Sequence, residues 1–427
     1  MAKILKIHSR QIIDSRGTPT VEVECHLDDG TIAIADVPSG ASTGEHEALE
    51  MRDQSTQFFG KSVLNAINNV NHVISPKLIG NDTYNIYEID QIMFDLDGTD
   101  NKRNLGANAI LGVSLACLKA FAQSKKLPIY QFIKNISQTK THIMPIPMMN
   151  ILNGGSHADN NVDIQEFMIY PSGFETFSES LQCGCEVFNT LKSVLKQKGY
   201  STSVGDEGGF APNLRSNQEA LDLLTESIIQ SNYKPGEEVF FTLDVASSEF
   251  YIKEKQTYKI DSENRNLTSD QMIDWYKKLC SNYPIVSIED GLDENDWKGW
   301  QNLYNELGKD IQLVGDDLTV TNPIRLQKAI STNAINAILI KLNQIGSVSE
   351  TLDTIKLAQK NNLGVVVSHR SGETEDTTIA DLAVGTGAGQ IKTGSLCRSE
   401  RVAKYNQLLR IEEQLSPETI FGPQNNE

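Results

Sequence analysis

Three acidic residues in the second half of the chain each stand at the end of a short apolar run. They are Asp244, Glu289 and Asp316. Two later runs end in other reactive side chains, Lys341 and the neighbours His369 and Arg370. Runs of this length, separated by helix-sized segments, indicate buried parallel strands. Because the carboxyl ends of such strands meet at one end of a β/α barrel, where active sites form, the pattern predicts an enzyme with a metal site.

The metal that suits these three carboxylates is Mg²⁺, because it prefers a small number of oxygen ligands and leaves room for substrate and water. A single acid after a strand is more often a helix cap or a surface residue. The metal-site interpretation therefore depends on the three acids occurring together, with Lys341 and Arg370 at the ends of the next strands.

Glycine-rich segments supply three more candidates. Glu207 stands in such a turn, where the backbone can carry a carboxylate close to a ligand. His157 follows a Gly-Gly pair, and Ser42 lies in residues 38–44, a segment typical of a flexible lid. Each segment could equally be an ordinary structural turn. The lid lacks the lysine of a phosphate-binding P-loop, so nucleotide binding is not expected.

The segment Ser368–Gly372 combines the guanidinium of Arg370 with the hydroxyl of Ser371 in a turn, which suits a phosphate group. Lys392 adds a cation on the next expected strand. An arginine after a buried strand can also serve only to pair with an acid. Together the three cationic side chains favour a small phosphorylated acid as ligand.

The composition excludes several classes of protein. Among 427 residues there are 38 Lys and Arg against 56 Asp and Glu, a formal charge of −18, which disfavours nonspecific binding to nucleic acid or to an anionic membrane. The six cysteines lack zinc-site spacing and are expected to be free thiols. No signal peptide and no apolar stretch of about 20 residues is visible, so a cytoplasmic location is expected, with export by a non-classical route as the open alternative.

The pattern of apolar residues changes along the chain and predicts two domains. Residues 1–137 read as an α+β capping domain, and residues 138–427 as a β/α barrel. The strands of the capping domain are expected at 3–7, 20–27 and 31–37, and they are followed by helices from Glu45 to Ile136. From residue 143 onward apolar runs alternate with amphipathic helices, and the last strand is expected from Gly389.

Ten segments, in the same order along the chain, resemble the bacterial-type members of the enolase family, the phosphopyruvate hydratases. They are Ile13–Gly17, Pro38–Gly44, Gly106–Ile110, Asn153–Ala158, Gln165–Met168, Gly205–Gly209, Ser287–Gly291, Leu339–Gly346, Ser368–Asp376 and Gly389–Gly394. The resemblance implies the enolase-type variant of the TIM barrel with an N-terminal α+β capping domain. It also implies a magnesium-dependent lyase that reversibly dehydrates 2-phosphoglycerate to phosphoenolpyruvate in glycolysis.

The resemblance further implies a role for each candidate. Asp244, Glu289 and Asp316 would hold one Mg²⁺, and Ser42 would help to recruit a second. Lys341 would be the general base and Glu207 the general acid, with the cations near Lys341 lowering its pKa toward the neutral amine. The substrate-contacting positions would be His157, Gln165, Glu166, His369, Arg370, Ser371 and Lys392.

Two other readings stay open at this point. A sister enzyme, such as a sugar-acid dehydratase or a racemase, would share the three acids but not the Ser42 lid, Glu207 and the Arg370–Ser371 pair. Family members are also known as surface receptors for host proteins and as scaffolds in RNA-degrading complexes. The resemblance suggests at least a homodimer, with no direct binding of nucleic acid and no insertion into a membrane.

Overall fold

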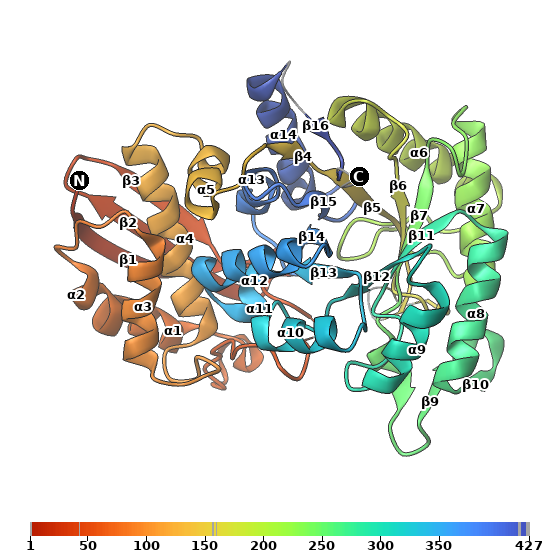
Figure 1. Cartoon of the computed structure of the whole chain (residues 1–427), viewed down its shortest axis with the longest axis horizontal. Helices are drawn as coiled ribbons and strands as arrows, with labels where there is room; N and C mark the ends of the chain where they lie inside the picture. The colour runs from red at the N-terminus through yellow and green to blue at the C-terminus, as the bar shows by residue number, and fades with distance from the viewer. Residues whose placement is uncertain (1, 42, 156–157, 159, 417–419, 424–427) are drawn as a thin grey trace.

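The computed structural model describes residues 2–41, 43–155, 158, 160–416 and 420–423, and it has an N-terminal unit beside a barrel (Figure 1). The strands of the N-terminal unit are β1 (Ile4–Ile13), β2 (Pro19–Leu27) and β3 (Ile32–Asp36). Its helical elements are η1 (Gln57–Gly60), α1 (Leu64–Asn69), η2 (Val70–Ile74), α2 (Ser75–Leu78), α3 (Ile86–Asp97), α4 (Ala107–Ser124) and α5 (Ile129–Ser137). The order of strands first and helices later confirms the predicted α+β unit.

The N-terminal strands form an antiparallel sheet in the order β1-β2-β3. Gly30, with a φ of 89°, sits in the turn between β2 and β3, where its missing side chain permits the left-handed conformation. Alternate residues of β2, such as Val21, Val23 and Cys25, are buried, because α4 packs against this face of the sheet. α4 is buried over most of its length, since α11 (Leu342–Ile345) and α12 (Val348–Lys360) of the barrel cover its other side.

The expected helix start at Glu45 is wrong. Residues 45–56 have no helical turn, and the first helical element is η1. The backbone N–H groups of this segment donate hydrogen bonds to distant parts of the chain. Ala48 donates to the carbonyl of Gln344, Leu49 to that of Asn101, and Met51 to the side chain of Asn108. These contacts replace the internal hydrogen bonds of a helix and lead the segment from the sheet to the barrel.

Eight strands close the barrel in the order β11-β12-β13-β14-β15-β5-β6-β7. Their bounds are β5 (Ile146–Asn153), β6 (Glu166–Tyr170), β7 (Phe240–Asp244), β11 (Ile285–Glu289), β12 (Gln312–Gly315), β13 (Ala337–Ile340), β14 (Gly364–Ser368) and β15 (Gly389–Lys392). Alternate residues from five of them, Met148, Met168, Val314, Ala337, Leu339 and Val366, form a buried cluster. Because side chains alternate between the two faces of a strand, this cluster fills the interior of the barrel.

Strand β6 runs antiparallel to both of its neighbours, whereas the other seven strands run parallel to one another. Residues 154–165 therefore join β5 to β6 at one end of the barrel. As a result the first residue of β6, Glu166, pairs with the last residue of β7, Asp244. The sequence did not reveal this reversal, which places residues 165 and 166 among the carboxyl ends of the other strands.

Helices surround the barrel, and α10 to α12 lie on the side of the N-terminal unit (Figure 1). They are α6 (Phe177–Gln197), α7 (Asn217–Gln230), α8 (Ser269–Asn282), α9 (Trp297–Leu307), α10 (Pro323–Ser331), α11 (Leu342–Ile345), α12 (Val348–Lys360), α13 (Thr378–Gly385) and α14 (Ser399–Leu415). The remaining short elements are β4 (Ile143–Met144), η4 (Ser247–Phe250), β8 (Tyr251–Ile252), β9 (Thr257–Ile260), η5 (Asp261–Glu263), β10 (Arg265–Leu267) and β16 (Ile420–Phe421). Among the described residues, none of these helices is long and apolar enough to cross a bilayer.

Candidate active site

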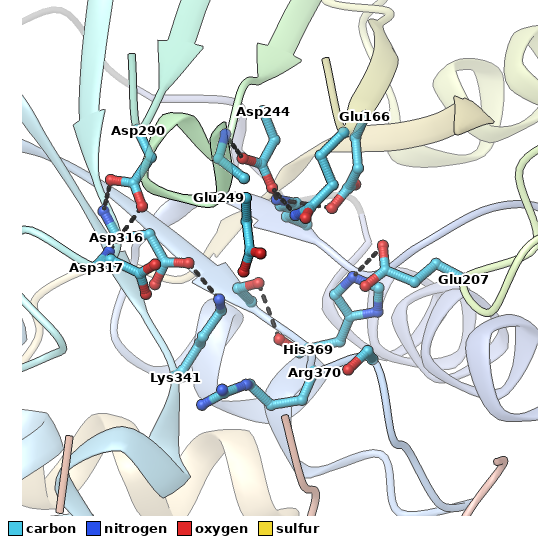
Figure 2. A pocket seen from close by; sticks show the side chains of 15 residues that line it. Glu166, Glu207, Asp244, Glu249, Asp290, Asp316, Asp317, Lys341, His369 and Arg370 are labelled. Carbon is cyan, nitrogen blue, oxygen red and sulfur yellow. Dashed lines mark hydrogen bonds and ion pairs between the residues drawn. The ribbon is translucent and has the colours of Figure 1, made fainter. Parts of the chain in front are cut away.

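A polar pocket lies at the carboxyl ends of the barrel strands (Figure 2). Its walls are Gln165, Glu166, Glu207, Asp244, Ala246, Glu249, Asp290, Asp316, Asp317, Lys341, Ser368, His369, Arg370, Ser371 and Lys392. Ten of the predicted site residues are in this set, and most of them lie at ends of strands that meet at the same face. Glu289 is brought to the same place through a contact with Lys392. Ser42 and His157 lie outside the described residues.

Lys392 at the end of β15 contacts three carboxylates. Its Nζ is 2.7 Å from Asp244 Oδ2, 2.9 Å from Glu289 Oε1 and 3.1 Å from Glu166 Oε1. All four side chains are buried, so one ammonium group faces three carboxyl groups with almost no water to separate them. Burial and the repulsion of Asp244 raise the pKa of Glu289 well above its usual value. Burial and the repulsion of Glu207 do the same to the pKa of Glu166.

Lys341, which follows β13, forms an ion pair with Asp316. Burial is the largest influence and lowers the pKa of Lys341, but the carboxylates of Asp316 and Glu289 act against it, and the net shift is upward. The expectation that nearby cations lower this pKa holds for Arg370 and Lys392, but these two cations do not set the direction of the net shift. Arg370 and Lys392 do lower the pKa, but Asp316 lies closer and its attraction is stronger.

Sequence reasoning missed three acids of the pocket, Glu249, Asp290 and Asp317. The carboxylates of Asp290, Asp316 and Asp317 offer oxygens that lie within 4.8 Å of one another. Asp290 has a φ of 44°, and its carboxylate accepts the backbone N–H groups of Asp316 and Asp317, each at 2.9 Å. A visible signal existed for Asp290 and Asp317, since each directly follows a predicted ligand in the sequence, whereas Glu249 has no such neighbour.

The donor set of the pocket fits a hard divalent cation. It consists of buried carboxylate oxygens, which Mg²⁺ prefers, and it contains more acids than bases. Burial first, and the repulsion of Asp244 second, raise the pKa of Glu289. A bound cation would relieve that repulsion, so the residues present fit a metal ion.

Glu207 lies in the glycine-rich turn between α6 and α7. Its Oε2 accepts a hydrogen bond from Asn150 Nδ2 at 3.2 Å and lies 3.4 Å from His369 Nε2. The turn needs its glycine at 209, because a Cβ there would lie 2.4 Å from Asn153 Oδ1. The absence of that side chain lets the turn pack tightly on β5 and carry Glu207 into the pocket.

Arg370 and Ser371, after β14, contact the N-terminal unit. Glu47 Oε2 lies 3.0 Å from Arg370 Nη1, and Ser371 Oγ accepts a hydrogen bond from the Ala41 N–H at 2.7 Å. Arg16 Nη1 lies 3.3 Å from the same hydroxyl. These partners come from positions more than 300 residues away in sequence, so the strand-end pattern did not identify them.

Two family models match the chain in agreement with this geometry. The model of the enolase N-terminal domain matches residues 4–133, and that of the enolase C-terminal TIM barrel domain matches residues 141–427. Enolases are in general magnesium-dependent and act on small phosphorylated acids, in keeping with the carboxylates and cations of the pocket. With both models matched over nearly its whole length, the chain belongs to the enolase family, whose members are lyase-type enzymes with a TIM barrel.

Proposed function

We propose that this chain is a phosphopyruvate hydratase, which reversibly dehydrates 2-phosphoglycerate to phosphoenolpyruvate and water. The observation that supports this most is that Lys341 and Glu207 lie on opposite sides of one pocket (Figure 2). A dehydration needs a base for the C2 proton and an acid for the C3 hydroxide, acting on different parts of one small substrate. Lys341 is the base in this proposal, and Glu207 is the acid.

The cationic side chains of the pocket suit the two anionic groups of this substrate. Arg370 offers a planar fork of donors and Ser371 a hydroxyl for the phosphate. Lys392 is proposed to meet the carboxylate, together with Gln165 and Glu166 at the start of β6. His157 and Ser42 keep their proposed roles as substrate contact and lid residue, and His369 is proposed to assist Glu207.

Removal of the C2 proton places a second negative charge on the substrate carboxylate. The superfamily is a known example of a lysine base combined with Mg²⁺ that stabilises this charge. We propose that Asp244, Glu289 and Asp316 hold the first of two Mg²⁺ ions, which would supply the positive charge. Lys392 would add to it from the end of β15, already fixed in place by buried carboxylates.

Lys341 must give up its own proton before it can act as the base. The attraction of Asp316 opposes this step, whereas Arg370 and Lys392 favour it. Glu207 must instead hold a proton to deliver to the leaving hydroxide, and the nearby Glu166 carboxylate favours its neutral form. The pocket thus holds a base and an acid in environments of different charge.

The proposal is tested by following the ultraviolet absorbance of the enolpyruvate product with 2-phosphoglycerate, with and without Mg²⁺. We expect turnover that requires the metal and is lost in Lys341→Ala. The matched control Lys277→Ala removes an exposed lysine from a surface ion pair and should keep full activity. A chain without metal-dependent turnover, or one that dehydrates an unphosphorylated sugar acid equally well, would contradict the proposal and favour a sister enzyme.

We also propose that the chain divides into domains at residues 1–137 and 138–427. Two facts support this division: α5 ends at Ser137, and the two family matches leave a gap at residues 134–140. A homodimer, a cytoplasmic location and second roles as a surface receptor or RNA-degradation scaffold stay predictions.

A further inference from the structure

Arg401, on α14, is a fully buried arginine directly behind the pocket. Its Nη2 donates to the backbone carbonyls of Ser371 at 2.6 Å and of Asp206 at 3.3 Å. Its Nη1 donates to the carbonyl of Arg370 and contacts His369 Nδ1. A single guanidinium group thereby touches both segments that carry the proposed acid and its histidine.

The contact with His369 determines where that imidazole carries its proton. A guanidinium group keeps its protons and can only donate hydrogen bonds. His369 Nδ1 must therefore accept, and the proton of the neutral ring lies on Nε2. The Nε2 atom is the one that lies 3.4 Å from Glu207 Oε2. The nitrogen that carries the proton therefore lies on the side of the Glu207 carboxyl group, and Figure 2 marks the contact between the two side chains.

We propose that Arg401 is a positioning residue, which holds His369 in the neutral tautomer with its N–H directed at Glu207. The inference rests on the proposed function only for the role of Glu207 as the acid. The tautomer itself follows from hydrogen bonding and can be measured without turnover.

The packing leaves the imidazole and the guanidinium little freedom. Gly394, with a φ of +80°, lies against both groups: a Cβ there would be 2.8 Å from Arg401 Cδ and 3.1 Å from His369 Cε1. The backbone N–H of His369 donates to the carbonyl of Lys392 at 3.0 Å. Because the ring is fixed on these sides, it cannot turn to exchange its two nitrogens without moving α14.

The charges around His369 agree with a neutral ring. Burial is the main cause that lowers the pKa of His369 to about 4, and the positive charge of Arg401 adds to it. The carboxyl groups of Glu207 and Glu373 act in the opposite direction. Glu373 is itself paired with Lys404 at 2.9 Å, which reduces its effect on the ring.

A neutral ring has a chemical advantage at this position. An imidazolium would be a full positive charge beside Glu207 and would favour the carboxylate over the acid form that dehydration requires. The neutral N–H instead donates a hydrogen bond, which stabilises the Glu207 carboxylate once its proton has left with the hydroxide. Arg401 thus keeps Glu207 able to hold a proton and then to release it.

The first test is heteronuclear NMR of the full chain with isotope-labelled histidine, in which His369 is identified by its loss in His369→Gln. We expect an Nε2-protonated ring that remains neutral down to about pH 4. A proton on Nδ1, or a titration near the ordinary value of 6.5, would overturn the inference. This measurement uses the unaltered protein, so it decides the matter even if variants of the buried arginine do not fold.

The second test compares Arg401→Met with the control Arg398→Met. Arg398 also donates to a backbone carbonyl, that of Ser15 at 2.8 Å. Among the described residues, none of its hydrogen bonds or ion pairs involves His369. Arg401→Met should move the His369 titration toward 6.5, whereas Arg398→Met should leave it unchanged. Dehydration by Arg401→Met should fall as the pH drops through the new titration, while C2 proton exchange persists.

An unchanged His369 titration in a folded Arg401→Met protein would overturn the inference. If the unaltered chain does not turn over 2-phosphoglycerate while His369 shows the expected tautomer, the proposed function fails and the positioning role of Arg401 stands. If turnover is normal and the tautomer is reversed, the positioning role fails alone.

Discussion

Glu47 and Arg370 form a bidentate ion pair between the N-terminal unit and the barrel. Glu47 Oε2 lies 3.0 Å from Arg370 Nη1, and its Oε1 lies 3.1 Å from Nη2. Their side chains are only 8% and 3% exposed. Glu47 also accepts the backbone N–H of Gly44 at 3.2 Å. The guanidinium group proposed for the substrate phosphate is thus oriented by the segment that carries the proposed lid.

We therefore expect Glu47→Gln to destabilise the protein strongly, because it leaves the buried charge of Arg370 without its carboxylate. Removing one partner of a buried pair costs roughly 3–5 kcal/mol. The free energy of unfolding in urea measures this loss, and inorganic phosphate should restore more stability to the variant than to the unaltered protein. The control Glu306→Gln breaks an exposed pair and should cost less than about 1 kcal/mol. Equal losses in the two variants would contradict this account.

Because Lys341 and Glu207 are proposed to act in different steps, substituting them should affect C2 proton exchange and dehydration differently. Lys341→Ala should abolish exchange of the C2 proton of 2-phosphoglycerate with solvent, because no base remains. Glu207→Gln should block dehydration by roughly 10²–10⁴-fold yet retain some exchange. Exchange followed by NMR in deuterated buffer separates the two steps. Exchange at the normal rate in Lys341→Ala would show that another group is the base.

The strand-end residues could be predicted from the sequence because the signal is local. Each apolar run fixes a buried strand, and parallel strands bring their carboxyl ends together whatever lies between them. The pattern therefore predicts that Asp244, Asp316, Lys341 and Lys392 share one site, and the structure brings all four into the pocket.

The rest of the site depends on contacts between segments far apart in sequence. Glu47 reaches Arg370, and Arg401 reaches His369, only through the packing of the N-terminal unit and of α14 on the barrel. The reversal of β6 was hidden for a related reason, since an apolar run does not show the direction of its strand. The net upward shift in the pKa of Lys341 was hidden as well, because it depends on distances to Asp316 and Glu289 that a sequence does not contain.

The buried carboxyl group of Asp381 should make the folded protein less stable as the pH rises. Burial raises its pKa from 3.8 to about 7, although its carboxylate accepts hydrogen bonds from the Tyr130 N–H and from Gln407. The folded protein therefore binds more protons than the unfolded chain between about pH 4 and 7, and its stability falls across that range. Asp381→Asn should remove this slope, and its free energy of unfolding near pH 7 should exceed that of the unaltered protein by a few kcal/mol. Urea unfolding at both ends of the range measures the difference, and a variant with an unchanged slope would contradict the assignment.

The carboxyl group of Asp376 should have the opposite effect on how the stability of the protein depends on pH. Burial acts to raise its pKa, but the ion pair with Lys119 and the hydrogen bonds from Thr378 together outweigh burial and lower the pKa to about 2. Its contribution to stability is present above pH 3.8 and is lost as the pH falls through about 2. Asp376→Asn should thus be less stable than the unaltered protein at neutral pH. The two proteins should converge in acid, as urea unfolding at several pH values would show; a constant difference would assign the effect to packing.

The metal site can be assigned by comparing two sets of acids that the pocket brings together. Asp290, Asp316 and Asp317 lie closest to one another, but Asp290 already accepts two backbone N–H groups, which limits its use as a ligand. Asp244→Asn should therefore weaken Mg²⁺ binding, measured by calorimetry, by more than the roughly 10–100-fold that changes around a ligand cause. Asp317→Asn, a matched loss of one charge, should cost less than about tenfold. The reverse order of affinities would move the metal to the closer set and leave Asp244 as a partner of Lys392 and Gln165.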